Sequence, residues 1–106
     1  MKKRRVTLSN ILKSSRFSQF EKDVYAAVSG IRRGEVRSYG WVAEKIGKPM
    51  ASRAVGNALN KNENTDIIPC HRVIKSDGTI GGYAKGVEAK RRILRREGVK
   101  YFVKPL

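Results

Sequence analysis

The single cysteine and the single histidine of this 106-residue chain are neighbours, Cys70 and His71, in the run Pro-Cys-His-Arg-Val. A cysteine thiolate is a strong nucleophile, and an imidazole can remove the proton that masks it. Arg72 and the strongly positive chain favour the thiolate further, by lowering the pKa of the thiol. Consecutive side chains of an extended segment point to opposite faces, so a turn or a water would have to link the pair. The motif predicts a base-activated nucleophile, with a buried, unreactive cysteine as the alternative.

A base of this kind needs a carboxylate to orient it. Glu97 is one of nine acidic residues, and from its pattern alone a solvated partner of the surrounding arginines is the simpler interpretation. One cysteine cannot form an intramolecular disulfide, and one cysteine with one histidine is too few for a zinc site of protein ligands. We expect no metal and no cofactor.

Charge and length limit the class of protein. The chain has 24 Lys and Arg against 9 Asp and Glu, a formal net charge of +15. That excess favours a polyanionic partner, nucleic acid before an acidic membrane, over a merely solubilising surface. The length suits one small domain, and 40% apolar residues supply a modest core. No apolar run resembles a membrane span or a signal peptide, so we expect a soluble intracellular monomer, cytoplasmic, or nuclear in a eukaryote.

The positive charge is concentrated at the two ends. Residues 1–16 hold six basic and no acidic residues, and residues 85–104 hold eight basic and two acidic. Because residues 1–16 have few large apolar side chains, we expect a mobile basic arm there, with a lightly docked strand as the alternative. Residues 17–106 form the predicted domain.

Helical periodicity dominates this domain. Ser18 and Glu21 form a capping box that starts a helix over residues 18–32, and Ser38 can cap a second helix over residues 39–46. A third helix, residues 50–60, follows a short Gly-Lys-Pro turn, and the two short helices suggest a helix-turn-helix.

The rest of the chain predicts a wing and a last helix. An apolar run at 67–74, a turn at 76–78 and a second extended run at 79–83 suggest a small β hairpin. The last helix is expected over 86–97, with residues 101–103 packed against the core. The predicted fold is mainly α, a winged helix-turn-helix domain with a small β wing.

The third predicted helix has an outer face of small residues and a single long side chain, Arg53. A glycine within a helix costs about 1 kcal/mol relative to alanine, so a close approach should compensate for Gly56. The helix either packs tightly against another helix or enters the minor groove of B-DNA, which is about 6 Å wide. In the groove, Arg53 is a candidate wedge into the base stack. The other outward residues are Ser52, Asn57 and Asn60.

Several blocks of sequence carry a resemblance to a known family. In chain order they are Gly-Glu-Val-Arg-Ser-Tyr (34–39), Ala-Ser-Arg-Ala-Val-Gly-Asn-Ala (51–58), Asn62, Ile-Pro-Cys-His-Arg-Val (68–73), Gly-Gly-Tyr (81–83) and Glu-Gly (97–98). Over about residues 17–99 the chain resembles the C-terminal domain of O6-alkylguanine-DNA alkyltransferases, for which Pro-Cys-His-Arg-Val is a highly specific motif. The resemblance implies irreversible transfer of an alkyl group from guanine O6 to the cysteine, once per molecule.

The resemblance also implies a role for each matching residue near the cysteine. Cys70 would accept the alkyl group, His71 would take the thiol proton through a water, and Glu97 would orient His71. Asn62 would brace this network, and the Tyr39 hydroxyl would donate to the departing guanine.

Base and DNA contacts are implied in the same way. The carbonyls of Cys70 and Val73 would read the guanine amino group, and backbone N–H groups near Tyr83 and Ala84 would hold O6. Arg53 would fill the gap left by the flipped nucleotide in duplex DNA that contains O6-alkylguanine. The other expected DNA contacts are Ala51, Ser52, Gly56, Asn57 and Arg72.

Two departures from the family pattern matter. Relatives commonly carry a separate N-terminal domain, where we expect only the basic arm. Lys85 falls where many relatives have a small residue that lines the alkyl pocket, so we expect Lys85 to narrow or cross the pocket and to disfavour benzyl relative to methyl. Two alternatives stay open: a non-catalytic, alkyltransferase-like protein that binds damaged DNA, and a winged-helix regulator or ribosome-associated protein in which Cys70 and His71 are incidental.

Overall fold

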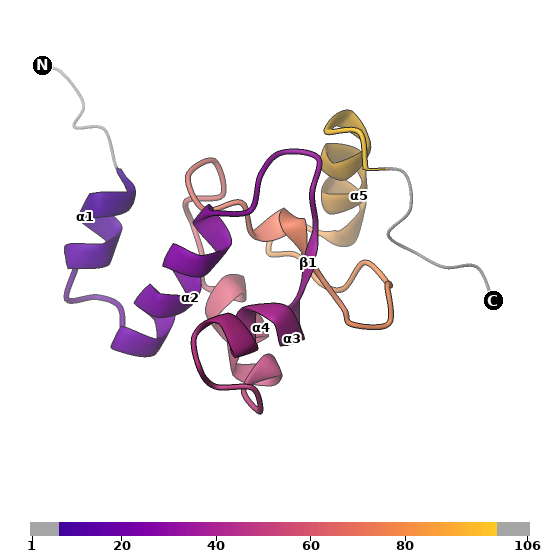
Figure 1. Ribbon diagram of the computed structural model, residues 1–106. Helices are drawn as coiled ribbons and strands as arrows, with labels where there is room; N and C mark the ends of the chain where they lie inside the picture. The colour runs from indigo at the N-terminus through magenta and orange to yellow at the C-terminus, as the bar shows by residue number, and fades with distance from the viewer. Residues whose placement is uncertain (1–6, 100–106) are drawn as a thin grey trace, which may run out of the picture.

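The computed structural model describes residues 7–99, which form five α-helices, one short 3-10 helix and two short strands. Helices α2, α3 and α4 lie together in the middle, with α1 on one side and α5 at the opposite end (Figure 1). The mainly helical prediction is therefore confirmed. In chain order the elements are α1 (Leu8–Lys13), α2 (Gln19–Ser29), β1 (Arg37–Ser38), α3 (Tyr39–Lys45), α4 (Ser52–Asn60), η1 (Cys70–Arg72), β2 (Val73–Ile74) and α5 (Val87–Arg96).

Side-chain caps set the starts of two central helices. The Ser18 side chain accepts from the backbone N–H of Glu21, whose carboxylate accepts in return from the N–H of Ser18, so the predicted capping box is present. Ser38 caps α3 by accepting from the N–H of Trp41 at 2.9 Å. Helix α4 begins after the turn at Gly47, whose φ of +77° favours glycine.

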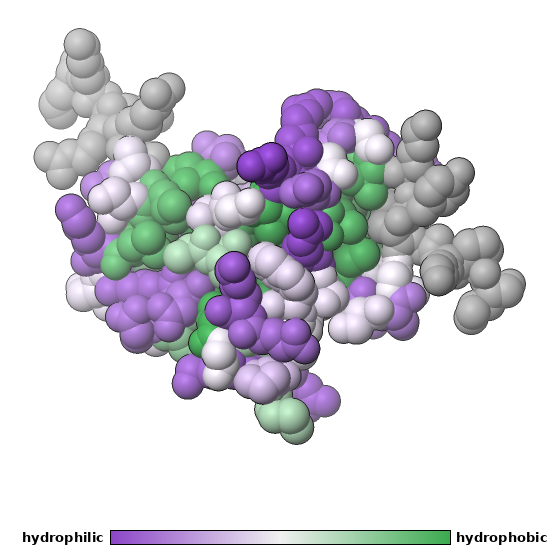
Figure 2. Space-filling view, viewed as in Figure 1, coloured by the Kyte–Doolittle hydropathy of each residue, from purple (hydrophilic) through white to green (hydrophobic). Residues whose placement is uncertain are grey.

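The main core lies between α2, α3 and α4. Val24, Val28, Val42 and Val55 are fully buried there. The hydroxyl of buried Tyr25 donates to the carbonyl of Ala58 at 2.7 Å, which ties α2 to α4. In the space-filling view hydrophobic side chains show between α1 and α2, with hydrophilic side chains around them (Figure 2). A second small cluster joins β2 to α5 and consists of Ile74, Ile80, Leu94 and Val99.

The predicted hairpin wing is wrong. Strand β2 instead pairs in parallel with β1, in the register Arg37 with Val73 and Ser38 with Ile74. The expected partner, residues 79–83, follows a tight loop in which the N–H of Lys75 donates to the carbonyl of Thr79. Its glycines prevent a regular strand there, because Gly81 has a φ of +72°. The packing expected for residues 101–103 lies outside the described residues.

The expectation of a mobile arm or a strand over residues 1–16 is wrong for the described part. Residues 8–13 are helical, and Thr7 and Asn10 cap each other's backbone at the start of α1. Ile11 is 3% exposed and belongs to the main core. Residues 1–6 lie outside the described part. Among the described residues no helix is long and apolar enough to cross a membrane.

Helix α1 should therefore contribute to stability. Replacing Ile11 with alanine should lower the free energy of unfolding by about 2 to 4 kcal/mol, because a buried aliphatic side chain leaves a cavity. The partly buried Leu12, on the same short helix, is the matched control and should cost less when replaced in the same way. Urea denaturation measures both values. Equal, small losses at the two positions would mean that α1 does not pack on the core.

Candidate active site

Cys70 lies at the start of η1 and at the base of a small pocket. The residue is only 5% exposed. The pocket is lined by residues from the start of α3, the end of α4 and the loop before α5. The ring of Tyr83 lies edge-on to the imidazole of His71, with ring centroids 6.4 Å apart. The other lining residues are Tyr39, Leu59, Asn60, Gly82 and Ala84.

Asn62 holds the turn that precedes the cysteine. It is 4% exposed, and its side-chain amide donates to the carbonyl of Ile68 at 3.0 Å. Its Oδ1 accepts from the N–H of Asn64 at 2.9 Å. The N–H of Cys70 donates to the same Ile68 carbonyl at 2.7 Å, so Asn62 and Cys70 share one anchor. The structure thus brings Asn62 to the position that a bracing residue requires.

His71 and Arg72 both bind Glu97, the C-cap residue of α5. The Glu97 Oε2 atom lies 3.0 Å from Nε2 of His71. Arg72 grips the same carboxylate with two donors, Nε at 3.0 Å and Nη2 at 2.8 Å. Burial favours the neutral acid, but the hydrogen bonds from Arg72 and His71 outweigh it and lower the pKa of Glu97 to about 2. Glu97 is therefore a carboxylate at neutral pH.

Arg72 is thus an internal clamp, and its expected contact with DNA stays a prediction. Its third donor, Nη1, reaches the carbonyl of Ile31 at 2.8 Å, so the whole guanidinium is engaged inside the protein. A guanidinium that grips a carboxylate with two parallel hydrogen bonds fixes its orientation as well as its charge. Arg72 therefore positions Glu97.

This clamp decides the tautomer of His71. An ionised carboxylate only accepts hydrogen bonds, so Nε2 carries the proton and Nδ1 carries the lone pair. Nδ1 is buried and has no hydrogen-bond partner among residues 7–99. Burial lowers the pKa of His71, although Glu97 opposes the shift, so the ring stays neutral at pH 7. His71 therefore presents a basic nitrogen that nothing else in the described structure occupies.

The pKa of the Cys70 thiol shifts in the direction opposite to that expected from the sequence. Burial raises its pKa, and this outweighs the lowering by Asn62 and by the positive charge of Lys90. The resting thiol is therefore protonated, and it needs a base to become a nucleophile.

Lys90 is a site residue that sequence reasoning missed. It is fully buried, and its Nζ donates to the carbonyls of Val73 at 2.6 Å and Gly82 at 3.0 Å. Burial lowers the pKa of Lys90 to about 8. Lys90 stands four residues before Leu94, on the apolar stripe of α5, and that spacing could have revealed it. It fixes the carbonyl of Gly82, which lines the pocket, and the Val73 carbonyl expected to read the base.

The Tyr39 hydroxyl lies at the mouth of the pocket. It is within 3.4 Å of the Gly82 carbonyl, and burial raises its pKa, so it keeps its proton and can donate. Gly81 is required beside it: its φ is +72°, and a Cβ there would stand 3.0 Å from the hydroxyl oxygen.

The outer face of α4 borders a cavity of about 530 Å³ that shares Tyr39, Asn60 and Gly82 with the small pocket. The expected surface residues of α4 therefore lie on a cavity that adjoins the small pocket of Cys70. Ala51 is an exception, because it packs on the core and does not line this cavity. The remaining lining residues are Ser52, Arg53, Gly56, Asn57, Lys75 and Ser76.

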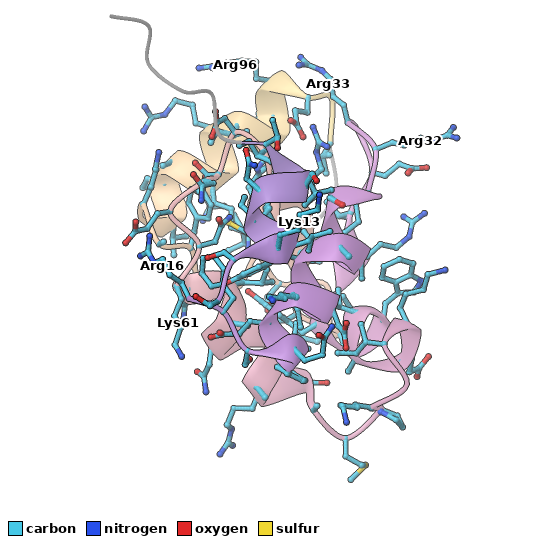
Figure 3. The ribbon with its side chains drawn as sticks, turned by 90° about the vertical axis from the view of Figure 1, so that its left-hand side faces the viewer. Lys13, Arg16, Arg32, Arg33, Lys61 and Arg96 are labelled. Carbon is cyan, nitrogen blue, oxygen red and sulfur yellow. The ribbon has the colours of Figure 1, made fainter. Side chains whose placement is uncertain are left out.

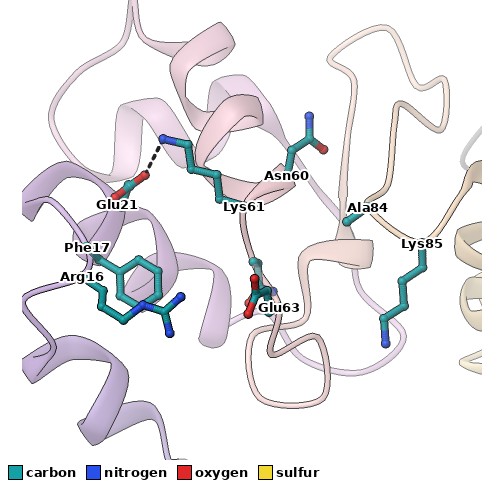
Figure 4. Close-up of a pocket in the computed structure, with 9 residues that line it drawn as sticks. Arg16, Phe17, Glu21, Asn60, Lys61, Glu63, Ala84 and Lys85 are labelled. Atoms are coloured by element: carbon teal, nitrogen blue, oxygen red, sulfur yellow. Dashed lines mark hydrogen bonds and ion pairs between the residues drawn. The ribbon is translucent and has the colours of Figure 1, made fainter.

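A larger cavity of about 610 Å³ adjoins the small pocket through Asn60 and Ala84 (Figure 4). Lys85 lines this larger cavity and is absent from the lining of the small pocket. Lys85 therefore lies beside the small pocket, and the expected preference for methyl over benzyl stays a prediction. No group of three or more metal-ligating side chains occurs within residues 7–99.

The clamp predicts a pH-dependent contribution to stability. The pKa of Glu97 falls from 4.5 to about 2 on folding, so its contribution is complete above pH 4.5 and is lost as the pH falls toward 2. E97Q should lower the free energy of unfolding at pH 7 by about 3 kcal/mol, since each pKa unit corresponds to about 1.36 kcal/mol. Urea denaturation between pH 2 and 7 measures the effect. The exposed Glu88, replaced in the same way, is the control, and parallel pH profiles for wild type and E97Q would contradict the prediction.

The sequence of this chain is similar to the sequences of known proteins. Residues 19–99 match the family described as "6-O-methylguanine DNA methyltransferase, DNA binding domain". The methylated-DNA–protein-cysteine methyltransferase of Methanosarcina acetivorans is 48% identical over 81 residues, which are 76% of this chain and 52% of that protein. The bifunctional transcriptional activator/DNA repair enzyme Ada of Escherichia coli is 48% identical over 82 residues, 77% of this chain and 23% of Ada. The chain spans about half the length of the first of these relatives.

Solved structures agree. Mycobacterium tuberculosis OGT in complex with DNA superposes with a TM-score of 0.75 and 45% identity, over 77% of this chain and 51% of that one. S. pombe Atl1 in complex with damaged DNA containing O6-carboxymethylguanine gives a TM-score of 0.72 and 36% identity, over 80% and 81% of the two chains. The match over residues 19–99, with both sequence relatives near 48% identity, shows that this chain belongs to the 6-O-methylguanine DNA methyltransferase family.

Proposed function

We propose that this protein repairs duplex DNA by transferring an alkyl group, such as methyl, from guanine O6 to Sγ of Cys70. The observation that carries the proposal is the state of His71, the residue that follows the buried cysteine. Glu97 fixes its Nε2 atom, and its basic Nδ1 atom has no hydrogen-bond partner among the described residues. A protonated thiol becomes a nucleophilic thiolate where a base is positioned to take its proton. The reaction occurs once per molecule, because the thioether that forms is not hydrolysed.

The transfer follows from the positions of these groups. Nδ1 of His71 takes the thiol proton, directly or through a water, and becomes an imidazolium stabilised by Glu97. The sulfur attacks the alkyl carbon; the S–C bond forms as the C–O6 bond breaks and its electron pair goes to the guanine. The Tyr39 hydroxyl and backbone N–H groups at Tyr83 and Ala84 then offset that charge, and a proton from Tyr39 or solvent neutralises the base.

DNA enters on the side of α4. In this proposal α3 and α4 form a helix-turn-helix, and the small outer face of α4 lies in the minor groove. The target nucleotide leaves the stack to reach Cys70, and Arg53 fills the gap. The cavity that joins Arg53 and Gly56 to Tyr39 supports this route.

A damage-binding role without transfer is the second candidate, since the chain is also similar to Atl1. Alkyltransferase-like proteins carry another residue in place of the reactive cysteine. Cys70, supported by Asn62 and set beside a neutral His71, favours transfer.

Intact-protein mass spectrometry tests the proposal. Incubation with a duplex that carries one O6-methylguanine should add a single methyl group to the wild-type protein, saturating at one per molecule. C70A should bind the duplex and gain no mass. Lesion-selective binding without an adduct on the wild type would instead establish the damage-binding role.

A further inference from the structure

Six exposed basic side chains gather on the face of the molecule that α1 and α2 present (Figure 3). They come from five separate segments: the end of α1, the link to α2, the link from α2 to β1, the end of α4 and the end of α5. We name this surface the basic face. Its residues are Lys13, Arg16, Arg32, Arg33, Lys61 and Arg96.

Little inside the protein neutralises this charge. Among the described residues, Lys61 has a carboxylate partner, Glu21 at 3.1 Å, and the other five basic-face residues have none. Arg33 and Arg96 are 63 residues apart in the sequence, and the fold brings them together. Nη2 of Arg33 donates to the carbonyl of Arg96 at 3.3 Å. A surface that carries several like charges without carboxylate partners is typical of proteins that bind a polyanion.

Helix ends explain only part of the cluster. Lys13 and Arg96 lie in the last turns of α1 and α5, where a cation stabilises the negative end of a helix. That effect fades beyond the last turn. Arg16, Arg32 and Arg33 lie past the C-caps of their helices, Ser14 and Gly30, so the helix dipole does not account for them.

Most of the basic face is also distinct from the surface beside Cys70. Only two lysine or arginine side chains of the described residues, Arg53 and Lys75, line the cavity along α4. The distal part of the basic face, formed by Lys13, Arg32, Arg33 and Arg96, lines neither of the two cavities that adjoin the small pocket. This distal part of the basic face is therefore separate from the proposed lesion site, whereas Arg16 and Lys61 line the larger cavity beside the small pocket.

We propose that the basic face binds the phosphate backbone of a second DNA segment while α4 holds the first. This rests on the proposed function, which supplies the first DNA site. Arginine suits a phosphodiester, since its planar guanidinium donates two parallel hydrogen bonds to phosphate oxygens. A protein that holds two segments can pass between them without leaving DNA, which shortens the search for a rare lesion.

The test compares wild type with K13Q/R32Q/R33Q/R96Q. Energy transfer between two undamaged duplexes, one labelled with a donor and one with an acceptor, measures bridging. The wild type should bridge the duplexes and the variant should not. The slope of log affinity against log salt should become shallower by about 0.9 for each phosphate that the variant no longer binds. Methyl transfer from a short O6-methylguanine duplex should stay within about twofold of wild type, because the four substitutions leave the proposed lesion site unaltered.

The matched control removes four charges elsewhere, in K22Q/K45Q/R91Q/R92Q, and it should keep bridging. Equal loss of bridging in both variants would overturn the proposal, because net charge alone would then be responsible. Bridging that survives in the first variant would also overturn the proposal. A lowered unfolding temperature with loss of both bridging and methyl transfer would overturn it as well, because the cluster would then be structural. Bridging without methyl transfer by the wild type would overturn only the proposed function.

Discussion

The bidentate grip of Arg72 on Glu97 is the interaction on which the rest of the site depends. It keeps a buried carboxylate ionised, and the ionised carboxylate forces the proton of His71 onto Nε2. The third donor of Arg72 reaches the Ile31 carbonyl just after α2, so one guanidinium joins the end of α2, η1 and the end of α5. The interaction that sets the chemistry of the base is thus also part of the tertiary structure.

Burial sets the protonation states of the titratable groups around Cys70. It raises the pKa of the Cys70 thiol and lowers the pKa values of His71 and Lys90, which leaves a protonated nucleophile beside a neutral base. A protonated thiol reacts slowly with solutes. Lys90 stabilises the opposite side of the pocket, where its donors fix the carbonyls of Val73 and Gly82.

Local sequence signals predicted the elements whose cause is local. The capping box at Ser18 and the cap at Ser38 each correspond to a helix start. The capping pair of Thr7 and Asn10 has the same physical cause and was missed, because the scarcity of large apolar side chains in residues 1–16 suggested an arm. The parallel pairing of Arg37 with Val73 depends on a long-range contact that no local pattern encodes.

In the candidate site, too, some features could be predicted from the sequence and others depend on the fold. The family resemblance implied that Glu97 orients His71, and the structure brings these two side chains together, but the sequence did not predict the electrostatics of the site. Arg72 was expected among the DNA contacts, and only the fold shows that it binds Glu97 and the carbonyl of Ile31. The direction of the pKa shift at Cys70 depends on how deeply the thiol is buried, which the sequence does not give.

The tautomer of His71 tests the central claim most directly, and the chain has a single histidine to observe. Long-range ¹H–¹⁵N correlation spectra of uniformly ¹⁵N-labelled protein, recorded across pH, distinguish protonated from unprotonated ring nitrogens. We expect a neutral ring at pH 7 with the proton on Nε2 and a titration below pH 6.5. A proton on Nδ1, or a charged ring at pH 7, would contradict it.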